Sequence, residues 1–590
     1  MARIISSLLA SVIFFSLGSF SYAQVAPHVR GPFPQISLPD RESSGQRAIT
    51  ILGNRLPEVA AWYGMSENKL RSILLNDKTA RISQEGRLFY VEEYKVVPPQ
   101  QGSTPTTPQQ GVSDGSLLPL DQTFTLHSKP TAQKTIYLNF NGKTVTNTAW
   151  TGSNTIVAPP YSADSTVSTG FSNSELTNIQ YIWQRVSEDY APFDVDVTTQ
   201  LPDPARITRS SSTDLEFGTE VLITAQSAGL YPCSCGGVAY VGIFDNTGDY
   251  YKPALVFWDM LGTGNEKYVA EAISHEAGHN LGLSHDGTST TGYYSGHSTG
   301  TYGWAPIMGV GYYQSLVQWS KGEYPDANNK EDDYVVIQSN ALPLLTDDHG
   351  NTPSTGTSLV SGTPVTGIIE KPTDVDVFSF WANAGSASFT LNAAYRSANL
   401  DAKIRLLDTN GIELAAANPA DFLAASLSLS LPTSGSYSIE VSGTGKGDLT
   451  TGYSNYGSLG NYTLSSSYTP YGGNVPTTSL TFQQSGSGGY VQSSPVGIDS
   501  LATPCTSSPC VALFDPSKTV TLTATATAGS TFGGWSGYCS STSTTCTVPM
   551  DISRSVNAIF NTIQSYTLSV SKTGSGTISS TPGGINCGST

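Results

Sequence analysis

The chain has 590 residues and a formal net charge of -17, which argues against nucleic acids and anionic membrane surfaces as its partners. Charged residues make up only 13 % of the chain and it holds 58 glycines, a composition typical of a polar, strand-rich exported protein and not of an acidic disordered one. A length of this order predicts about four domains.

Residues 1–23 have the layout of a secretory signal peptide. A basic residue, Arg3, precedes an apolar stretch that ends at Leu17, and small residues close the segment before Gln24. The alternative is an uncleaved membrane anchor, but the apolar stretch is short for a spanning helix. We therefore expect a secreted, extracellular monomer with no membrane span after cleavage, which could also associate with the cell surface.

Residues 24–97 form a small N-terminal unit. The pattern predicts short helices over 56–64 and 66–75 and a strand over 87–91. Its position ahead of the histidine motif described below favours a propeptide over a retained accessory domain. The following stretch, 98–118, is rich in Pro, Gln, Thr and Gly, which is typical of a linker and of a processing site.

Residues 119–346 combine strands and helices in one predicted domain. Ser172 and Glu175 have capping-box spacing and open a helix with an apolar face. A second helix begins near Asn265 and leads into the histidine motif. The predicted strands are 135–140, 194–198, 220–224, 238–244 and 254–257.

Residues 275–286 carry the pattern H-E-x-x-H-x-x-G-x-x-H-D. The chain has only seven histidines, and three of them, His275, His279 and His285, fall within this segment. The first two are four residues apart on a helix, so both imidazoles can bind one ion. Gly282 allows a turn through positive φ that returns His285 as a third ligand. Three protein ligands and one open position are typical of a catalytic zinc site.

The neighbouring residues complete a recognisable pattern. Glu276 follows the first ligand, where it can accept a proton from the attacking water instead of binding the ion. Met308 lies in a turn flanked by Pro306 and Gly309. With these features the chain resembles the metzincin superfamily of zinc endopeptidases, in which such a Met-turn lies beneath the metal. Asp286 makes it most similar to the adamalysin (reprolysin) branch, and we expect this residue to hold the loop by hydrogen bonding.

The resemblance implies an α+β catalytic domain, with a twisted mixed sheet and an active-site helix, that binds one catalytic Zn²⁺. It also implies an edge strand that pairs with an extended protein or peptide substrate, the alternative being an ordinary core strand. The residues of this strand are Val238, Ala239, Tyr240, Val241 and Gly242. The implied function is that of a secreted zinc metalloendopeptidase. Two alternatives stay open: a non-catalytic adhesin or matrix-binding protein, and a metallohydrolase of a non-peptide bond.

Latency of such a zymogen cannot depend on a cysteine in this chain. Adamalysin-type proenzymes often block zinc with a propeptide thiolate, whereas no cysteine precedes Cys233 here. Inhibition must then come from steric cover of the cleft, or from a weaker ligand such as His28 or a carboxylate. We expect activation by cleavage in the exposed linker.

The C-terminal half is predicted to be entirely β. Residues 347–470 alternate at period two and resemble the bacterial pre-peptidase C-terminal (PPC) β-sandwich, which implies contact with extracellular matrix or cell-surface polymers. Their aspartates could bind Ca²⁺, although exposed acidic residues usually stay solvated. Residues 471–562 resemble the divergent InlB B-type repeat, and 563–590 open a second, truncated copy. The expected fold class is therefore multidomain: an α+β catalytic domain, then an all-β sandwich and small β-repeat domains.

The seven cysteines fit an oxidising compartment. Cys587 is left over. The disulfide candidates are the local pairs Cys233 with Cys235, Cys505 with Cys510, and Cys539 with Cys546.

Overall fold

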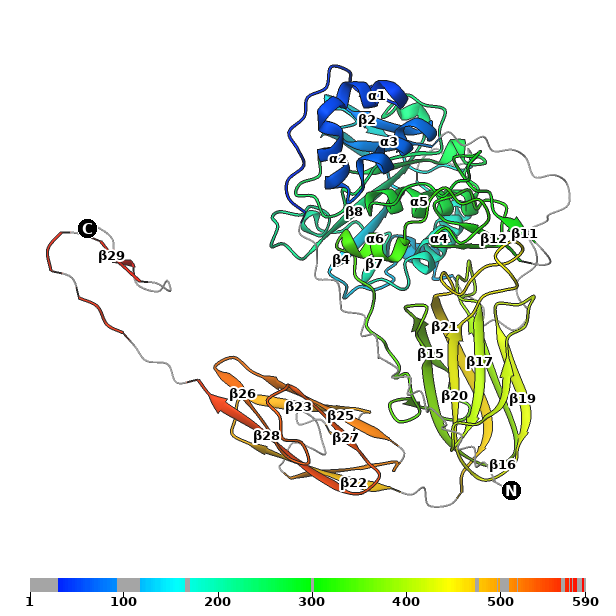
Figure 1. The fold of residues 1–590 in the computed structure, drawn as a ribbon, viewed down its shortest axis with the longest axis vertical. Coiled ribbons are helices and arrows are strands. Elements are labelled where there is room, and N and C mark those ends of the chain that lie inside the picture. Colours follow the sequence, from blue (N-terminus) through cyan, green and yellow to red (C-terminus); the bar gives the residue numbers. More distant parts are fainter. Residues whose placement is uncertain are drawn as a thin grey trace, which may run out of the picture. The chain divides into compact units, whose positions relative to one another are not determined.

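The computed structural model divides the chain into two compact units, one ending at Leu344 and one that begins in the main at Leu345 (Figure 1). The predicted signal peptide, His28, Cys505 and nearly all of the linker lie outside the described residues. The described residues are 30–92, 117–164, 170–298, 302–472, 477–495, 497–498, 509–516, 518–563, 568–571, 573–575, 577–580 and 586–587.

An eight-stranded mixed sheet runs through the first unit in the order β1-β2-β3-β9-β10-β8-β4-β7. The strands β7, β4, β8 and β10 are mutually parallel, while β9, β3, β2 and β1 add antiparallel pairs. Their bounds are β1 Glu42–Ser43, β2 Ala80–Ser83, β3 Leu88–Val91, β4 Lys134–Asn139, β7 Val195–Thr198, β8 Phe217–Thr224, β9 Gly237–Tyr240 and β10 Ala254–Phe257.

The predicted strands are present, but the one predicted over 238–244 is shorter at its end. It stops at Tyr240 because Gly242 adopts a φ of 61°, which leaves the extended conformation. The smaller strands of the unit form a hairpin and a short second sheet. They are β5 Lys143–Thr148, β6 Gly152–Ala158, β11 His297–Ser298, β12 Gly303–Pro306 and β13 Leu316–Gln318.

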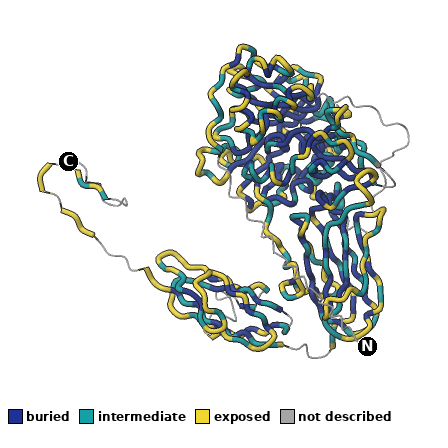
Figure 2. Tube along the Cα trace, viewed as in Figure 1, coloured by how far each residue is buried: buried dark blue, intermediate teal, exposed yellow. Residues whose placement is uncertain are grey.

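Two long helices pack together beside the sheet. Helix α4 (Asn173–Asp189) begins with the predicted capping box of Ser172 and Glu175. Helix α5 (Glu266–Asn280) begins at Asn265, whose side chain accepts two backbone N–H groups, and it carries the first two histidines. Every residue of α5 from Val269 onward is buried (Figure 2). Polar side chains on a helix so enclosed can reach only partners inside the protein, which restricts their positions.

The N-terminal unit is part of the same compact body as the domain of residues 119–346. Its helices are α1 (Gly45–Leu52), α2 (Leu56–Trp62), α3 (Glu67–Asn76). The two predicted helices correspond to α2 and α3, whereas α1 was not predicted. The core of this unit includes Val241 from the domain that follows it. The last helix of the first unit is α6 (Asp333–Ser339).

The second unit is built from strands in the part of the chain that the structure describes. Its first sheet has the order β15-β21-β16-β20-β17-β18, with β14 and β19 also paired to the long strand β16. These strands contain the alternating segments predicted from the sequence. Their bounds are β14 Thr357–Ser358, β15 Val365–Ile369, β16 Asp376–Ala393, β17 Ala402–Asp408, β18 Glu413–Ala417, β19 Ala425–Leu431, β20 Gly435–Gly443 and β21 Gly460–Pro470.

A smaller domain follows, made of the sheets β24-β22-β28-β26 and β23-β25-β27. Beyond it the described residues contain only the short pair β29–β30. The bounds are β22 Thr478–Ser485, β23 Gly489–Ser494, β24 Cys510–Phe514, β25 Thr519–Ala526, β26 Ser530–Gly537, β27 Thr545–Pro549, β28 Arg554–Thr562, β29 Ile578–Ser579 and β30 Asn586–Cys587. Among all described helices, none has the length and apolar character needed to cross a membrane.

Candidate metal centre

The three histidines of the motif are held in place through their Nδ1 atoms. His275 Nδ1 lies 2.9 Å from the carbonyl oxygen of Ile307, and His279 Nδ1 lies 2.8 Å from that of Leu283. A carbonyl oxygen only accepts, so each Nδ1 must donate its N–H and each Nε2 keeps its lone pair. The arrangement is that of metal-binding histidines, whose second ring nitrogen is fixed by an outer partner.

The third histidine has a carboxylate as its outer partner. Gly282 adopts a φ of 98°, as the sequence predicts, and the chain then turns back toward α5. His285 Nδ1 lies 2.6 Å from Asp77 Oδ2, a residue at the end of α3 in the N-terminal unit. The Nε2 atoms of His279 and His285 approach to 3.1 Å. At this distance either one Nε2 carries a proton that it donates to the other, or a cation lies between two lone pairs.

A fourth ligand atom completes the cluster. Glu92, directly after β3, places Oε1 at 2.9 Å from His285 Nε2, 3.2 Å from His279 Nε2 and 3.7 Å from His275 Nε2. Neighbouring ligands of a tetrahedral ion with metal–nitrogen bonds of about 2.1 Å are separated by roughly 3.4 Å. The ligand atoms of all four residues lie within 4.8 Å of one another. The donor set therefore fits a zinc ion.

The charges of the cluster also favour a cation. Burial works against a charged imidazole, yet the carboxylates of Glu92 and Asp77 raise the pKa of His285 to about 10. Burial and the neighbouring histidines lower the pKa of His279 to about 4. Glu92 itself is fully buried. Buried carboxylates need a positive partner, which can be an imidazolium or a bound metal.

Glu276 has no hydrogen-bond partner for either carboxylate oxygen within the described residues. Burial, and then the charge of Glu92, raise its pKa well above the ordinary value for a carboxyl group. Its side chain lies against Gly237 at the start of β9, where an added Cβ would come within 2.0 Å of Oε1. The glycine thus leaves the space that Glu276 occupies.

The predicted supporting residues lie around the base of α5. Met308 is fully buried, and its Sδ would be 2.8 Å from a Cβ at Gly278, so the missing side chain lets the methionine approach the helix. The Met308 carbonyl accepts the N–H of Asp286 at 2.8 Å. Burial, and then the charge of Glu331, raise the pKa of Asp286 to about 8. The main-chain N–H of Asp286 thus joins the third-histidine loop to the Met308 turn, while the loop-holding role expected of its side chain stays a prediction.

The predicted substrate-binding strand is not a free edge in this structure. Strand β9 pairs with β10 on one side and with β3 of the N-terminal unit on the other. Val241 and Gly242 lie beyond its end, and Val238, Ala239 and Tyr240 are buried. The expectation of an exposed edge over 238–242 is therefore wrong for the full chain, because a strand of the same chain occupies that edge.

Several residues near the cluster had no recognisable motif. Glu92 and Asp77 lack any spacing signal relative to the histidines. Tyr90 stacks on His279 with ring centroids 4.4 Å apart, and Tyr293 lies 4.4 Å from His285 and donates its hydroxyl to Glu92. The one sequence clue was the absence of a cysteine before Cys233, which left a carboxylate among the possible ligands.

The disulfide predicted between Cys233 and Cys235 is present, as is the one between Cys539 and Cys546. The first precedes β9, and Cys235 is fully buried. We expect no free thiol in this peptide when the native protein is exported to an oxidising compartment. Alkylation before and after reduction, read by mass spectrometry, checks this: two labelled thiols before reduction would contradict the pairing.

A second cluster, of acidic residues, lies in the second unit. Ligand oxygens of Asp347, Asp374 and Asp376 lie within 4.8 Å of one another. Asp374 Oδ1, Asp376 Oδ1 and both carboxylate oxygens of Glu370 are buried without a hydrogen-bond partner among the described residues. Burial, and then contact with Asp374, raise the pKa of Glu370 to about 10. Such crowded carboxylates could be stabilised by a hard cation.

Comparison with known proteins adds information on the C-terminal half. Residues 506–564 match the family model of the divergent InlB B-repeat domain. The match confirms the predicted repeat in this part of the chain.

Solved structures offer remoter likenesses. The pre-peptidase C-terminal domain of a collagenase from Bacillus anthracis is 18 % identical, over 20 % of this chain and 99 % of that one, with a TM-score of 0.15. PliG of Aeromonas hydrophila, a periplasmic inhibitor of g-type lysozyme, is 15 % identical over 19 % of this chain and 95 % of its own, also with a TM-score of 0.15. A search of curated proteins gave no match.

Proposed function

We propose that the chain is a secreted zinc-dependent metalloendopeptidase of the metzincin type. The observation that supports this most is the convergence of three Nε2 atoms whose Nδ1 atoms are fixed, beside the buried carboxyl group of Glu276. The Met308 turn beneath α5 and the mixed sheet agree with the proposal. The donor set of His275, His279 and His285 leaves one position for a further ligand.

In peptide hydrolysis, the metal, Glu276 and the main chain of β9 would have separate roles. When bound, zinc would polarise the scissile carbonyl and acidify the attacking water. Glu276 would take the proton from that water and pass it to the leaving amine, a role open to a buried carboxyl group that has no hydrogen-bond partner among the described residues. The main chain of β9 would hold the substrate in an extended conformation, once its edge is open.

The alternative function, a non-catalytic adhesin, makes different demands on the centre. It would need neither the base nor an ion, yet the buried Glu276 is costly to keep without a role, because its two oxygens lack partners among the described residues. A metallohydrolase of a non-peptide bond would use the same centre. The distinction between these functions therefore rests on the substrate.

The proposal is tested by incubating zinc-loaded protein with a denatured proteome and reading new termini by mass spectrometry. The protein is used both whole and after nicking by a serine protease that is then covalently quenched. We expect new internal termini that disappear when a chelator removes the metal and return with added zinc. Absence of such termini from both forms would contradict peptidase activity.

For the C-terminal half we propose a supporting role outside catalysis. The sandwich of residues 347–470 has the strand content expected of a PPC domain, and together with the repeat it would bind matrix or cell-surface polymers. Every residue of the proposed catalytic centre precedes this half, which leaves it free to select the location of the substrate.

We further propose that the acidic cluster of the sandwich binds Ca²⁺. In the zinc-loaded full chain, saturating Ca²⁺ should raise the unfolding temperature of this domain, since a ligand at 100 times its Kd stabilises by about 2.7 kcal/mol. The variant with Asp374→Asn and Asp376→Asn should lose this response. Asp421→Asn, an exposed partner of Lys446, serves as the control. Equal calcium responses in all three proteins, by calorimetry, would disprove the site.

A further inference from the structure

We infer that Glu92 is a fourth protein ligand of the metal, supplied by the N-terminal unit, and that it keeps the centre closed in the full chain. The inference rests on the proposed metal centre and extends it. In the full chain, the carboxylate of Glu92 would occupy the open position of that centre. The carboxylate would have to leave the metal before the protein could be active. The chain has no cysteine that could fill this role from the N-terminal side.

The position of Glu92 is fixed by the strand before it. In β3, Phe89, Tyr90 and Val91 lie opposite Tyr240, Ala239 and Val238 of β9. The main chain of Glu92 closes the ladder: its N–H donates to Gly237 O at 3.0 Å, and its carbonyl accepts the N–H of Gly236 at 2.9 Å. The side chain of Glu92 contacts the three histidines. The strand thus occupies the edge that a substrate would need, and it presents a carboxylate to the metal position.

The side chain of Glu92 makes contacts that suit a ligand. Oε1 faces all three Nε2 atoms, while Oε2 accepts the hydroxyl of Tyr293. One oxygen is thus directed to the metal position and the other is held by an outer partner, the usual arrangement for a ligating carboxylate. The residue is fully buried, so no water competes for it. A carboxylate oxygen is an accepted zinc ligand beside imidazoles.

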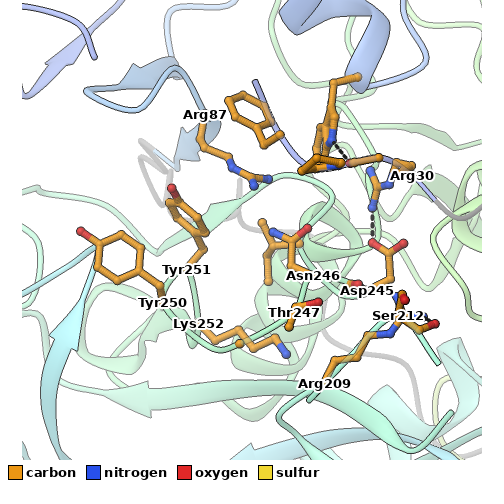
Figure 3. A pocket seen from close by; sticks show the side chains of 16 residues that line it. Arg30, Arg87, Arg209, Ser212, Asp245, Asn246, Thr247, Tyr250, Tyr251 and Lys252 are labelled. Carbon is orange, nitrogen blue, oxygen red and sulfur yellow. Dashed lines mark hydrogen bonds and ion pairs between the residues drawn. The ribbon is translucent and has the colours of Figure 1, made fainter. Parts of the chain in front are cut away.

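Contacts away from the metal hold the N-terminal unit in this place. A cavity of about 390 Å³ lies between the N-terminal unit and the domain that follows it. Arg30 and Arg87 line it on the side of the N-terminal unit (Figure 3). Arg30 forms an ion pair with Asp245 and donates to Gly242 O at 2.9 Å. The Arg87 guanidinium, just before β3, lies 4.7 Å from the ring of Tyr251. These contacts join the N-terminal unit to residues 242–251 at positions away from the metal site.

The N-terminal unit contacts the metal site through a second residue, Asp77. Its carboxylate holds His285 Nδ1 at 2.6 Å, and Thr79 supports that carboxylate at 2.9 Å through its N–H. The N-terminal unit therefore contributes both a ligand and the outer partner of another ligand. A unit that only covered the cleft would need neither contact.

The test uses the full chain loaded with Co²⁺ in place of zinc, because the visible bands of Co²⁺ report its ligands without any need for peptidase activity. Azide, a small anion, is titrated into the wild type, Glu92→Ala, Glu92→Gln and the control Glu58→Gln. Glu58 lies on α2 in an exposed ion pair with Arg55. Truncation of Glu92 leaves space for azide on the metal.

We expect every protein to bind one Co²⁺. Azide should change the visible bands of Glu92→Ala at a concentration at least about tenfold lower than it needs in the wild type. The reason is that an internal ligand bound nine-tenths of the time lowers the apparent affinity for azide by that factor. Glu58→Gln should behave as the wild type. Glu92→Gln, which keeps the size but weakens the ligand, should fall between and guards against misfolding of the alanine variant.

An azide response of the wild type equal to that of both Glu92 variants would overturn the inference while leaving the metal centre intact. Failure of all proteins to bind Co²⁺ would overturn the proposed centre itself, and the inference with it. The two failures are thus distinguished by the same titration.

Discussion

Replacing Glu276 with glutamine should lower the rate of peptide hydrolysis by about 10³-fold while the protein keeps its zinc, because a positioned general base contributes on the order of 10²–10⁴. The amide has nearly the size of the carboxyl group, so it should fit against Gly237 without disturbing α5. It cannot accept and return the proton. The measurement compares initial rates on a quenched peptide with zinc content by atomic emission, using protein nicked ahead of the catalytic domain.

Glu271→Gln is the matched control for this variant. Glu271 lies on the same helix, where it pairs with Lys267 at 2.8 Å. Its change should leave the rate close to that of the wild type. A zinc-loaded Glu276→Gln protein that hydrolyses peptides at the wild-type rate would refute the proposed mechanism.

Replacing His279 with alanine should instead remove the metal. Zinc bound by a set of protein ligands is held with about 10–16 kcal/mol, so the loss of one donor among four should weaken binding on the order of 10²-fold. Competition with a chromophoric chelator measures this affinity. Peptidase activity should fall in parallel with zinc content and return in part at high zinc concentration.

His297→Ala provides the control for the histidine variant. His297 lies outside the cluster, with its Nδ1 at 2.7 Å from the hydroxyl of Tyr294. Its removal should leave zinc affinity unchanged. Equal affinities of the wild type and His279→Ala would show that His279 is not a ligand and would remove the basis of the proposed centre.

The sequence was informative about the centre wherever the chemistry is local. The spacing of His275 and His279 places both on one face of a helix, and the turn to His285 needs a glycine with positive φ. Those features depend on residues within a few positions of each other. The predicted helix and the predicted positive φ of Gly282, which is 98°, therefore agree with the structure.

The remaining features depend on contacts between distant parts of the chain. Glu92 is 187 residues from His279, and Asp77 is 208 residues from His285. No spacing rule links residues across such distances, since tertiary contacts such as the pairing of β3 with β9 bring them together. For the same reason β9 was predicted as a free edge: a strand's own sequence does not say which partner lies beside it.

The eight-stranded sheet of the first unit continues into the N-terminal unit. This continuity has a consequence for the solubility of the protein. If the unit is cut away, β9 is left with a row of unpaired N–H and C=O groups, which any extended chain can use, including a second copy of the protein. The strand edge proposed to bind substrates and the edge prone to aggregation would then be the same. While β3 stays paired with β9, this edge is covered and cannot pair with another chain.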